Sequence, residues 1–113
     1  TRGLLGPREF ALMKEGAIFV NGGRRATVQE DALLQALDSG RLRAAGLDVF
    51  RVEPLPQDSP LIGHPRVTAL PHIGSATHET RHAMARLATT SLLQALAGER
   101  PAAVYVNAPI PPA

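Results

Sequence analysis

Residues 71–88, PHIGSATHETRHAMARLA, contain side chains with the types and spacing of a catalytic site. His78, Glu79 and His82 form the H-E-x-x-H pattern, in which two histidines one helical turn apart bind zinc and the glutamate acts as a general base. A zinc hydrolase also needs a third protein ligand and a bound water. Alanines stand where the extended pattern has its glycine and third histidine. We therefore predict no metal site, and zinc hydrolysis ranks third among the functional hypotheses.

His72 lies in a different setting, directly after an apolar segment and just before the small residues at 74–76. Small residues let a ligand approach the backbone closely. Arg24, Asp48 and Glu53 also follow apolar segments. Taken singly, each of these four polar residues has an ordinary structural explanation, such as a surface charge, a helix cap or a local hydrogen bond. Their shared position after predicted strands is what indicates a site.

The pattern around these residues predicts alternating strands and helices. Short apolar runs predict the strands, and proline, threonine and glycine at the expected ends predict the helices. The predicted strands cover residues 17–20, 44–50 and 66–70, and the predicted helices cover residues 7–14, 27–39 and 77–97. We expect the first strand to be buried on both faces and a capping box at 27–30 to begin the second helix. This order is typical of an α/β fold with a parallel sheet, in which ligands bind at the carboxyl ends of the strands.

The composition argues against several classes of protein. The 113 residues include no cysteine, which excludes disulfides and thiolate sites from this sequence and favours a reducing cytoplasm as its location. No apolar run approaches the roughly 20 residues that span a bilayer, and we expect no signal peptide. A net charge of +2 and an aromatic content of 4% do not give the footprint of a nucleic-acid-binding protein. The expected partner is therefore a small molecule.

Three segments carry a specific resemblance. They are GAIFVNGGRRATVQEDALLQAL, AAGLDVFRVEPLPQDSPL and VTALPHIGSATHETR. Together they resemble the C-terminal half of the D-isomer-specific 2-hydroxyacid dehydrogenases, over residues 1–107. The motif PHIGSATHETR is most similar to that of the bacterial glyoxylate/hydroxypyruvate and 2-ketogluconate reductases. The intervals of 24, 5 and 19 positions that separate Arg24, Asp48, Glu53 and His72 match the family pattern.

The resemblance implies a reaction and roles for three residues. The reaction is the reduction of a small 2-keto acid, namely glyoxylate, hydroxypyruvate or 2-ketogluconate, by NADPH or NADH to the D-2-hydroxy acid. Arg24 is implied to hold the substrate carboxylate, which suits the two-pronged geometry of a guanidinium. His72 is implied to be the acid/base that protonates the carbonyl oxygen. Glu53 is implied to hydrogen-bond His72 and to stabilise its protonated ring.

The resemblance also implies contacts with the cofactor and reveals some departures. Asp48 is implied to contact the nicotinamide carboxamide, and Gly22, Gly23 and Gly74 are implied to let the main chain lie against the cofactor. The chain departs from the usual family residues at three positions. These are Arg25 in place of glycine, Arg51 in place of an acidic residue, and Ser91 in place of asparagine. None of these departures removes an implied catalytic group.

The implied architecture is a partial Rossmann-type parallel sheet, the second half of a dinucleotide-binding domain, followed by a long C-terminal helix. Residues 1–98 are expected to form this part of the domain, and residues 99–113 a tail that returns to a substrate domain. The chain has no G-x-G-x-x-G turn for the pyrophosphate, so we expect a fragment that is inactive alone. The family also implies a homodimer. The alternative function is a non-catalytic binding or regulatory module on the same fold.

Overall fold

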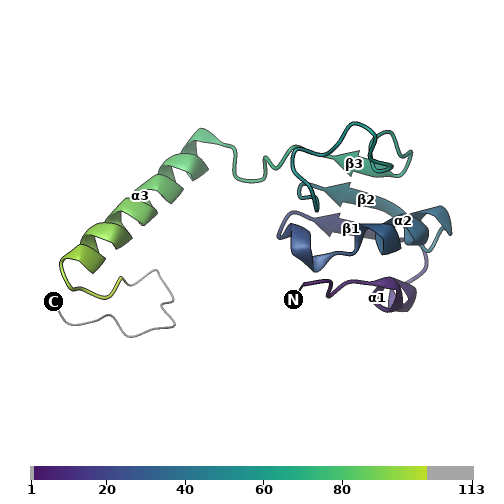
Figure 1. Cartoon of the computed structure of the whole chain (residues 1–113), viewed down its shortest axis with the longest axis horizontal. Coiled ribbons are helices and arrows are strands. Elements are labelled where there is room, and N and C mark those ends of the chain that lie inside the picture. The colour runs from purple at the N-terminus through teal and green to yellow at the C-terminus, as the bar shows by residue number, and fades with distance from the viewer. Residues whose placement is uncertain (1, 102–113) are drawn as a thin grey trace. The chain divides into compact units, whose positions relative to one another are not determined.

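The computed structural model describes residues 2–101, which fall into two compact units divided between Gly74 and Ser75. The first unit carries the sheet, and the second carries one long helix (Figure 1). The elements of the first unit are α1 (Pro7–Leu12), β1 (Ala17–Asn21), the 3₁₀ turn η1 (Arg25–Thr27), α2 (Glu30–Asp38), β2 (Leu42–Leu47) and β3 (Val67–Ala69). The second unit contains α3 (His78–Leu96).

The sheet of the first unit has the order β1-β2-β3, and both neighbouring pairs are parallel. In its register Phe19 lies opposite Ala45, and Leu47 lies opposite Ala69. Helix α2 connects β1 to β2, so these elements form a β-α-β unit. The predicted α/β fold with a parallel sheet is confirmed. Because the strands run in one direction, the loops that follow them emerge at one edge of the sheet.

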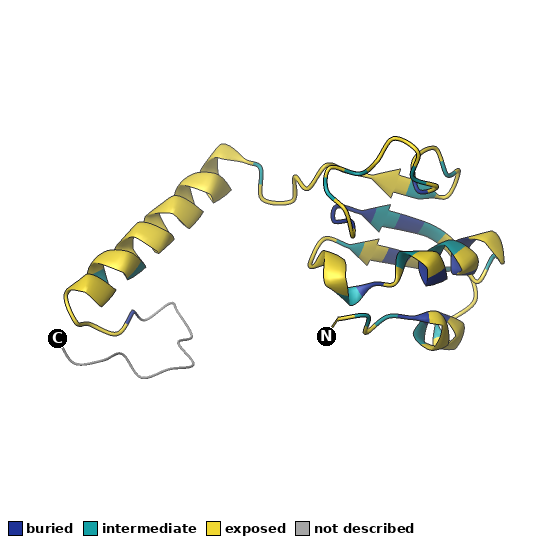
Figure 2. Cartoon of the chain, viewed as in Figure 1, coloured by how far each residue is buried: buried dark blue, intermediate teal, exposed yellow. Residues whose placement is uncertain are grey.

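The core lies between the sheet and helices α1 and α2 (Figure 2). Phe10, Leu33, Leu37 and Leu42 are almost completely buried, each at 1% exposure or less. The rings of Phe10 and Phe19 meet edge to face, with their centroids 5.4 Å apart. Burial of one such side chain stabilises a fold by about 1.5–3 kcal/mol, so this cluster fixes α1 and α2 against the strands.

The expectation that the first strand is buried on both faces is wrong for the first unit. Phe19 is 9% exposed, but its neighbours Ile18 and Val20 are 62% and 74% exposed. Side chains alternate between the two faces of a strand, and α1 and α2 pack against the face that carries Phe19. The continuous apolar run was therefore a correct sign of a strand but not of its burial in the described unit.

The predicted start of the second helix at Thr27 is also wrong. Arg25–Thr27 form a 3₁₀ turn, and the Thr27 hydroxyl donates to the carbonyl oxygen of Arg24. Val28 then pairs with Leu5 in an isolated parallel bridge. Helix α2 begins only at Glu30, whose carboxylate accepts the backbone N–H of Arg51. The glutamate of the expected capping box is thus held by a distant loop instead of by Thr27.

The remaining boundaries differ by a few residues. The first helix ends at Leu12 and not near residue 14, and the second strand covers Leu42–Leu47 and not residues 44–50. The third strand is shorter than predicted, at Val67–Ala69. Asp48 therefore follows its strand directly, and its backbone N–H donates to the carbonyl oxygen of Asn21 at 2.9 Å. This bond joins the carboxyl ends of β1 and β2.

The prediction for the long helix is confirmed. The Thr77 side chain accepts the backbone N–H of Thr80 at 3.1 Å and caps α3, and Gly98 follows the helix with a φ of 75°. In residues 2–101 no helix combines the length and the apolarity that crossing a membrane requires. The assignment of residues 1–98 to one domain stays a prediction, and most of the expected tail, residues 102–113, lies outside the described residues.

Candidate active site

The centre of the candidate site is a hydrogen-bonded pair formed by His72 and Glu53. His72 Nδ1 lies 2.9 Å from Glu53 Oε2, although 19 positions separate the two residues. The other carboxylate oxygen of Glu53 accepts the backbone N–H of Phe50 at 2.9 Å. The Glu53 side chain is 23% exposed, whereas that of His72 is 56% exposed. The carboxylate is therefore fixed from two sides, while the imidazole remains accessible to a ligand.

These hydrogen bonds lower the pKa of Glu53 below its ordinary value of 4.5. The largest cause is the bond with His72, followed by the bond from the Phe50 N–H, and the positive charge of Arg25 contributes in the same direction. Burial raises this pKa, but the other effects outweigh it. Glu53 is accordingly an anion near neutral pH, and an ionised carboxylate can only accept a hydrogen bond. His72 Nδ1 must then carry its proton, which leaves Nε2 as the atom for acid/base work.

Asp48 holds the turn that carries His72. Its Oδ1 accepts the backbone N–H of Ile73 at 2.8 Å, and its Oδ2 accepts that of Gly74 at 2.7 Å. Asp48 is 8% exposed, and His72 has a left-handed φ of 55°. Left-handed backbone is uncommon outside glycine, so the two bonds from Asp48 help to hold the chain in this conformation. The predicted contact of Asp48 with nicotinamide stays a prediction.

Gly74 is required by this same turn. A Cβ atom at this position would lie 2.9 Å from Asp48 Oδ2, closer than real contacts allow. Gly22 and Gly23 are in a different situation, because a Cβ at Gly22 would meet nothing within 4 Å. The Gly23 N–H donates to Asn21 Oδ1 at 3.2 Å. The backbone at Gly22 is thus open to an approaching ligand, whereas Gly74 is small because of its own neighbour.

Arg24 lies in the loop that follows β1, at the same edge of the sheet as Asp48. Its guanidinium donates to the carbonyl oxygen of Gly23 at 3.3 Å. Among residues 2–101, no hydrogen bond or ion pair joins Arg24 to Glu53 or His72. The structure therefore brings two of the three predicted catalytic side chains into contact and places the third on the neighbouring loop. The catalytic roles of all three residues remain predictions.

Glu53 lies where two hollows in the surface meet. One hollow of about 650 Å³ is mainly apolar and has His72, Leu55 and Ile62 in its wall. The other, of about 780 Å³, is lined by charged residues that include Arg25 and Arg51. Sequence reasoning missed the second hollow, although the substitution of arginine at positions 25 and 51 was visible. It also missed the backbone N–H of Phe50, which no side-chain pattern reveals.

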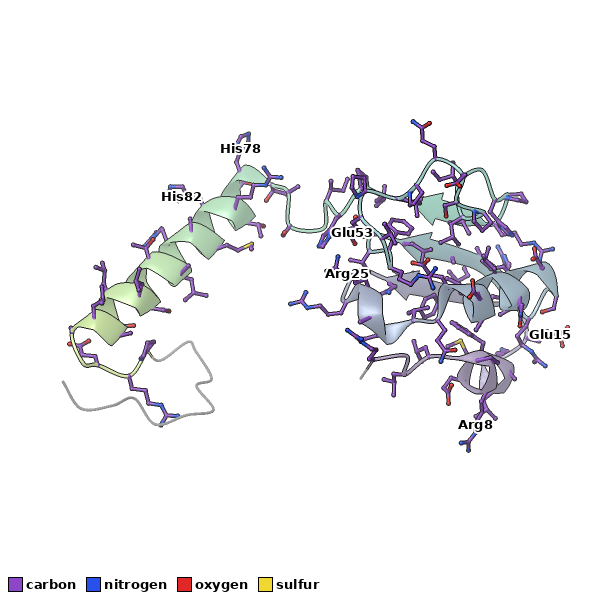
Figure 3. All side chains as sticks on the ribbon, in the orientation of Figure 1. Arg8, Glu15, Arg25, Glu53, His78 and His82 are labelled. Carbon is purple, nitrogen blue, oxygen red and sulfur yellow. The ribbon has the colours of Figure 1, made fainter. Side chains whose placement is uncertain are left out.

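The H-E-x-x-H residues lie at the start of α3, outside the unit that holds His72. His78 and His82 project from the helix (Figure 3). In the part of the chain that the structure describes, no three His, Cys, Asp or Glu side chains are grouped as a metal site. The two histidines thus lack a third ligand within residues 2–101, while Glu79 lies in the first turn of the helix, where its charge complements the helix dipole.

Comparison with known proteins decides the family. Residues 1–74 match the model of the NAD binding domain of D-isomer specific 2-hydroxyacid dehydrogenases. The chain belongs to this family. It is 59% identical over 99 residues to glyoxylate/hydroxypyruvate reductase B of Citrobacter koseri, and the match covers 88% of this chain but 31% of that protein. The chain therefore spans less than a third of the length of this dehydrogenase relative.

Solved structures of dehydrogenases agree with this assignment and confirm the Rossmann-type fold. A glyoxylate reductase from Paecilomyes thermophila has a TM-score of 0.80 and 41% identity, over 88% of this chain and 30% of that chain. An NADPH-dependent glyoxylate/hydroxypyruvate reductase from Sinorhizobium meliloti, in complex with NADP and sulfate, has a TM-score of 0.78 and 32% identity. That match covers 93% of this chain and 34% of the Sinorhizobium chain. The resemblance found in the sequence motifs is thereby confirmed.

Proposed function

We propose that this chain supplies the acid/base machinery of a reductase that converts a small 2-keto acid into the D-2-hydroxy acid with NADPH or NADH. The observation that carries the proposal is the 2.9 Å bond between His72 Nδ1 and the Glu53 carboxylate, in a chain of the 2-hydroxyacid dehydrogenase family. A carboxylate at Nδ1 orients an imidazole so that its Nε2 can exchange a proton with substrate. The accessible side chain of His72 supports this role.

Each proposed step follows from the charge that develops on the substrate. When bound, the cofactor supplies a hydride to the keto carbon. Negative charge then grows on the keto oxygen, which favours a nearby cation and a proton donor. His72, in its imidazolium form, donates the Nε2 proton to this oxygen and retains the Nδ1 proton on its bond to Glu53. Arg24 is proposed to bind the substrate carboxylate through its guanidinium.

The proposed cofactor contacts lie in the segments that follow the strands. Gly22, Gly23 and Gly74 are proposed to let the main chain lie against the cofactor, and the open space beside Gly22 supports close approach of a ligand to this backbone. Asp48 is proposed to contact the carboxamide in addition to holding Gly74. A carboxylate oxygen can accept more than one hydrogen bond, so the two roles are compatible.

The names of the relatives favour glyoxylate and hydroxypyruvate as substrates, and we propose 2-ketogluconate as a third. We also propose that the whole protein acts as a homodimer in the cytoplasm, as the family resemblance implies. A lack of cysteine in the 113 residues agrees with a reducing compartment.

The test uses the intact natural protein that contains this sequence, with NADPH and NADH and each of the three keto acids. Oxidation of the cofactor is followed by absorbance. His72→Asn is expected to lower kcat by about 100- to 10,000-fold, the usual contribution of a general acid. His78→Asn removes a histidine of the H-E-x-x-H pattern and is expected to leave the rate unchanged. Equal turnover by the protein with and without His72 would support the non-catalytic module instead.

A further inference from the structure

The loop that follows β2 carries Glu53, and its backbone makes few contacts that would hold it in place. Within the part of the chain that the structure describes, no backbone–backbone hydrogen bond begins or ends in residues 49–55. Phe50 is buried at 4% exposure, but the two residues after it are exposed. An exposed segment without such bonds opens easily. The position of the Glu53 carboxylate therefore depends on the side chains that contact this loop.

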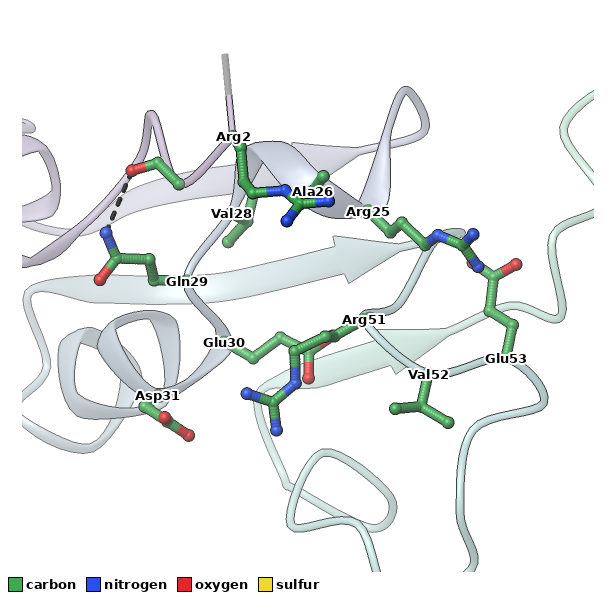
Figure 4. Close-up of a pocket in the computed structure, with 11 residues that line it drawn as sticks. Arg2, Arg25, Ala26, Val28, Gln29, Glu30, Asp31, Arg51, Val52 and Glu53 are labelled. Atoms are coloured by element: carbon green, nitrogen blue, oxygen red, sulfur yellow. Dashed lines mark hydrogen bonds between the residues drawn. The ribbon is translucent and has the colours of Figure 1, made fainter.

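Two carboxylates bind consecutive backbone N–H groups of the loop. Glu53 Oε1 accepts the N–H of Phe50 at 2.9 Å, and Glu30 Oε1 accepts the N–H of the next residue, Arg51. Glu30 is the first residue of α2 and lies 21 positions from Arg51 along the chain. In Figure 4 its side chain extends from the start of α2 toward Arg51. Among the hydrogen bonds of the described residues, this bond ties the exposed part of the loop to another element.

The bond to Glu30 lies next to the contact that orients His72. The second oxygen of Glu53 lies 2.9 Å from His72 Nδ1, so the loop that Glu30 holds is the loop that carries the partner of the imidazole. The turn at His72 is held separately, because Asp48 accepts its backbone N–H groups. Release of the loop at Glu30 would therefore move Glu53 relative to a turn that stays in place. A displacement of this kind is costly, since a misplacement of about 1 Å can lower a rate about 100-fold.

The residue after Glu30 shows which of its properties matters for the loop. Glu30 and Asp31 both lie in the first turn of α2, where a negative charge complements the helix dipole. Asp31 is exposed, and none of the side-chain hydrogen bonds of residues 2–101 involves it. The two carboxylates thus share a position at the start of the helix, but only that of Glu30 binds the loop. A role in the helix can therefore be separated from a role in the loop.

We propose that Glu30 is a positioning residue for the acid/base pair, because its carboxylate oxygen holds the backbone N–H of Arg51 and so keeps Glu53 against His72. This inference rests on the proposed reductase function. Glu30 acts through Glu53 and not on the substrate itself. The role requires an acceptor oxygen at the end of a side chain of glutamate length, and it does not require the negative charge.

Two replacements of Glu30 separate the reach of the side chain from its charge. Glu30→Gln keeps the length and an acceptor oxygen but removes the charge, whereas Glu30→Asp keeps the charge but is one methylene shorter. In the intact natural protein that contains this sequence, Glu30→Asp is expected to lower kcat for hydroxypyruvate about 10- to 100-fold. Glu30→Gln should retain most of the natural kcat. Neither variant should change the KM for hydroxypyruvate greatly, because the carboxylate of the substrate is assigned to Arg24.

Asp31→Asn is the matched control. It removes a negative charge from the same turn of α2 without affecting the bond to Arg51, and it should leave kcat unchanged. Thermal unfolding of each variant verifies that it is folded.

Two further measurements show whether Glu30 acts through Glu53. In a Glu53→Ala background, Glu30→Asp should have no further effect on kcat, because the carboxylate that Glu30 positions is absent. A residue that only stabilises the fold would lower kcat by the same factor in both backgrounds. The second measurement is the dependence of kcat/KM on pH. An ionised carboxylate beside an imidazole favours its protonated form, so Glu30→Asp should move the alkaline fall of kcat/KM to lower pH, whereas Glu30→Gln and Asp31→Asn should keep the natural profile.

The outcomes separate this inference from the proposed function. If His72→Asn abolishes reduction but Glu30→Asp keeps the natural kcat and pH profile, the inference alone is overturned. Equal losses of kcat in Glu30→Gln and Glu30→Asp overturn it too, because the charge of Glu30 would then be the cause. So does a Glu30→Asp effect that persists in full in the Glu53→Ala background. If the natural protein reduces no keto acid at all, the proposed function fails and this inference fails with it.

Discussion

The Asp48 carboxylate joins the end of β2 to the turn that carries His72, and the strength of this connection is testable. In Asp48→Asn one of the two carboxylate oxygens becomes an NH₂ group, which faces a backbone N–H of Ile73 or Gly74. An unpaired buried N–H costs about 1–3 kcal/mol. We expect this loss in the free energy of unfolding measured with urea. Asp58→Asn, at an exposed position without a side-chain hydrogen bond in the described residues, is the control and should change stability little. Equal stabilities of the two variants would contradict the assigned role.

The lowered pKa of Glu53 predicts a dependence of stability on pH. Because the folded-state pKa lies below the ordinary value of 4.5, the unfolded chain binds more protons in acid, and acid favours unfolding. This contribution is fully present above pH 4.5 and disappears as the pH falls through the folded-state pKa. Glu53→Gln should therefore lose less stability than the natural protein between neutral pH and acid. Glu15→Gln, at an exposed position, should follow the natural protein. Thermal unfolding over a pH series measures the difference. The same change of melting temperature with pH in all three proteins would contradict the prediction.

The residues of the site were predictable to different degrees. His72 and Glu53 were found from motif spacing, because the distance along the chain between strand ends is set by the elements between them. The reason for Gly74 was not found, since its close approach to Asp48 depends on the left-handed turn at His72. In the sequence, Arg25 was noted only because it replaces the glycine that is usual in the family. Its place in a hollow with Arg51 depends on folding that no local signal encodes.

At the level of elements, the Thr77 cap makes a prediction for α3. The Thr77 hydroxyl accepts the Thr80 N–H at 3.1 Å, and loss of such a cap costs about 0.5–2 kcal/mol of helix stability. Thr77→Ala should therefore lower the helical signal in circular dichroism during thermal unfolding. Thr90→Ala makes the same substitution at an exposed position inside the helix, where alanine is the better helix former. It should raise the helical signal or leave it unchanged. A lower helical signal for Thr90→Ala than for Thr77→Ala would contradict the capping role of Thr77.

The two elements that were predicted less well share a cause. A Thr-x-x-Glu pattern at 27–30 satisfies the rule for a capping box, but the bridge between Val28 and Leu5 keeps this segment extended. The apolar run of β1 satisfies the rule for a fully buried strand, but burial depends on what covers each face. Both outcomes are set by contacts between distant segments, whereas the Thr77 cap is local and was predicted correctly.

At the level of the whole molecule, the chain carries the acid/base residues but no G-x-G-x-x-G turn within its 113 residues. That turn brings backbone N–H groups and a helix N-terminus to the pyrophosphate of the cofactor. We therefore expect the 113-residue chain alone to bind NADPH and NADH weakly in calorimetric titrations and to reduce none of the keto acids.

The matching experiment restores the missing turn by exchange with a relative. A chimera in which this chain replaces the corresponding 99 residues of the Citrobacter koseri reductase is expected to oxidise NADPH or NADH with glyoxylate, because its own Arg24, Glu53 and His72 then meet a complete cofactor site. The same chimera with His72→Asn should lose this activity, which shows that the transferred residues perform the step. Robust turnover by the isolated 113-residue chain would contradict the requirement for the cofactor-binding turn. An active His72→Asn chimera would contradict the requirement for the acid/base pair.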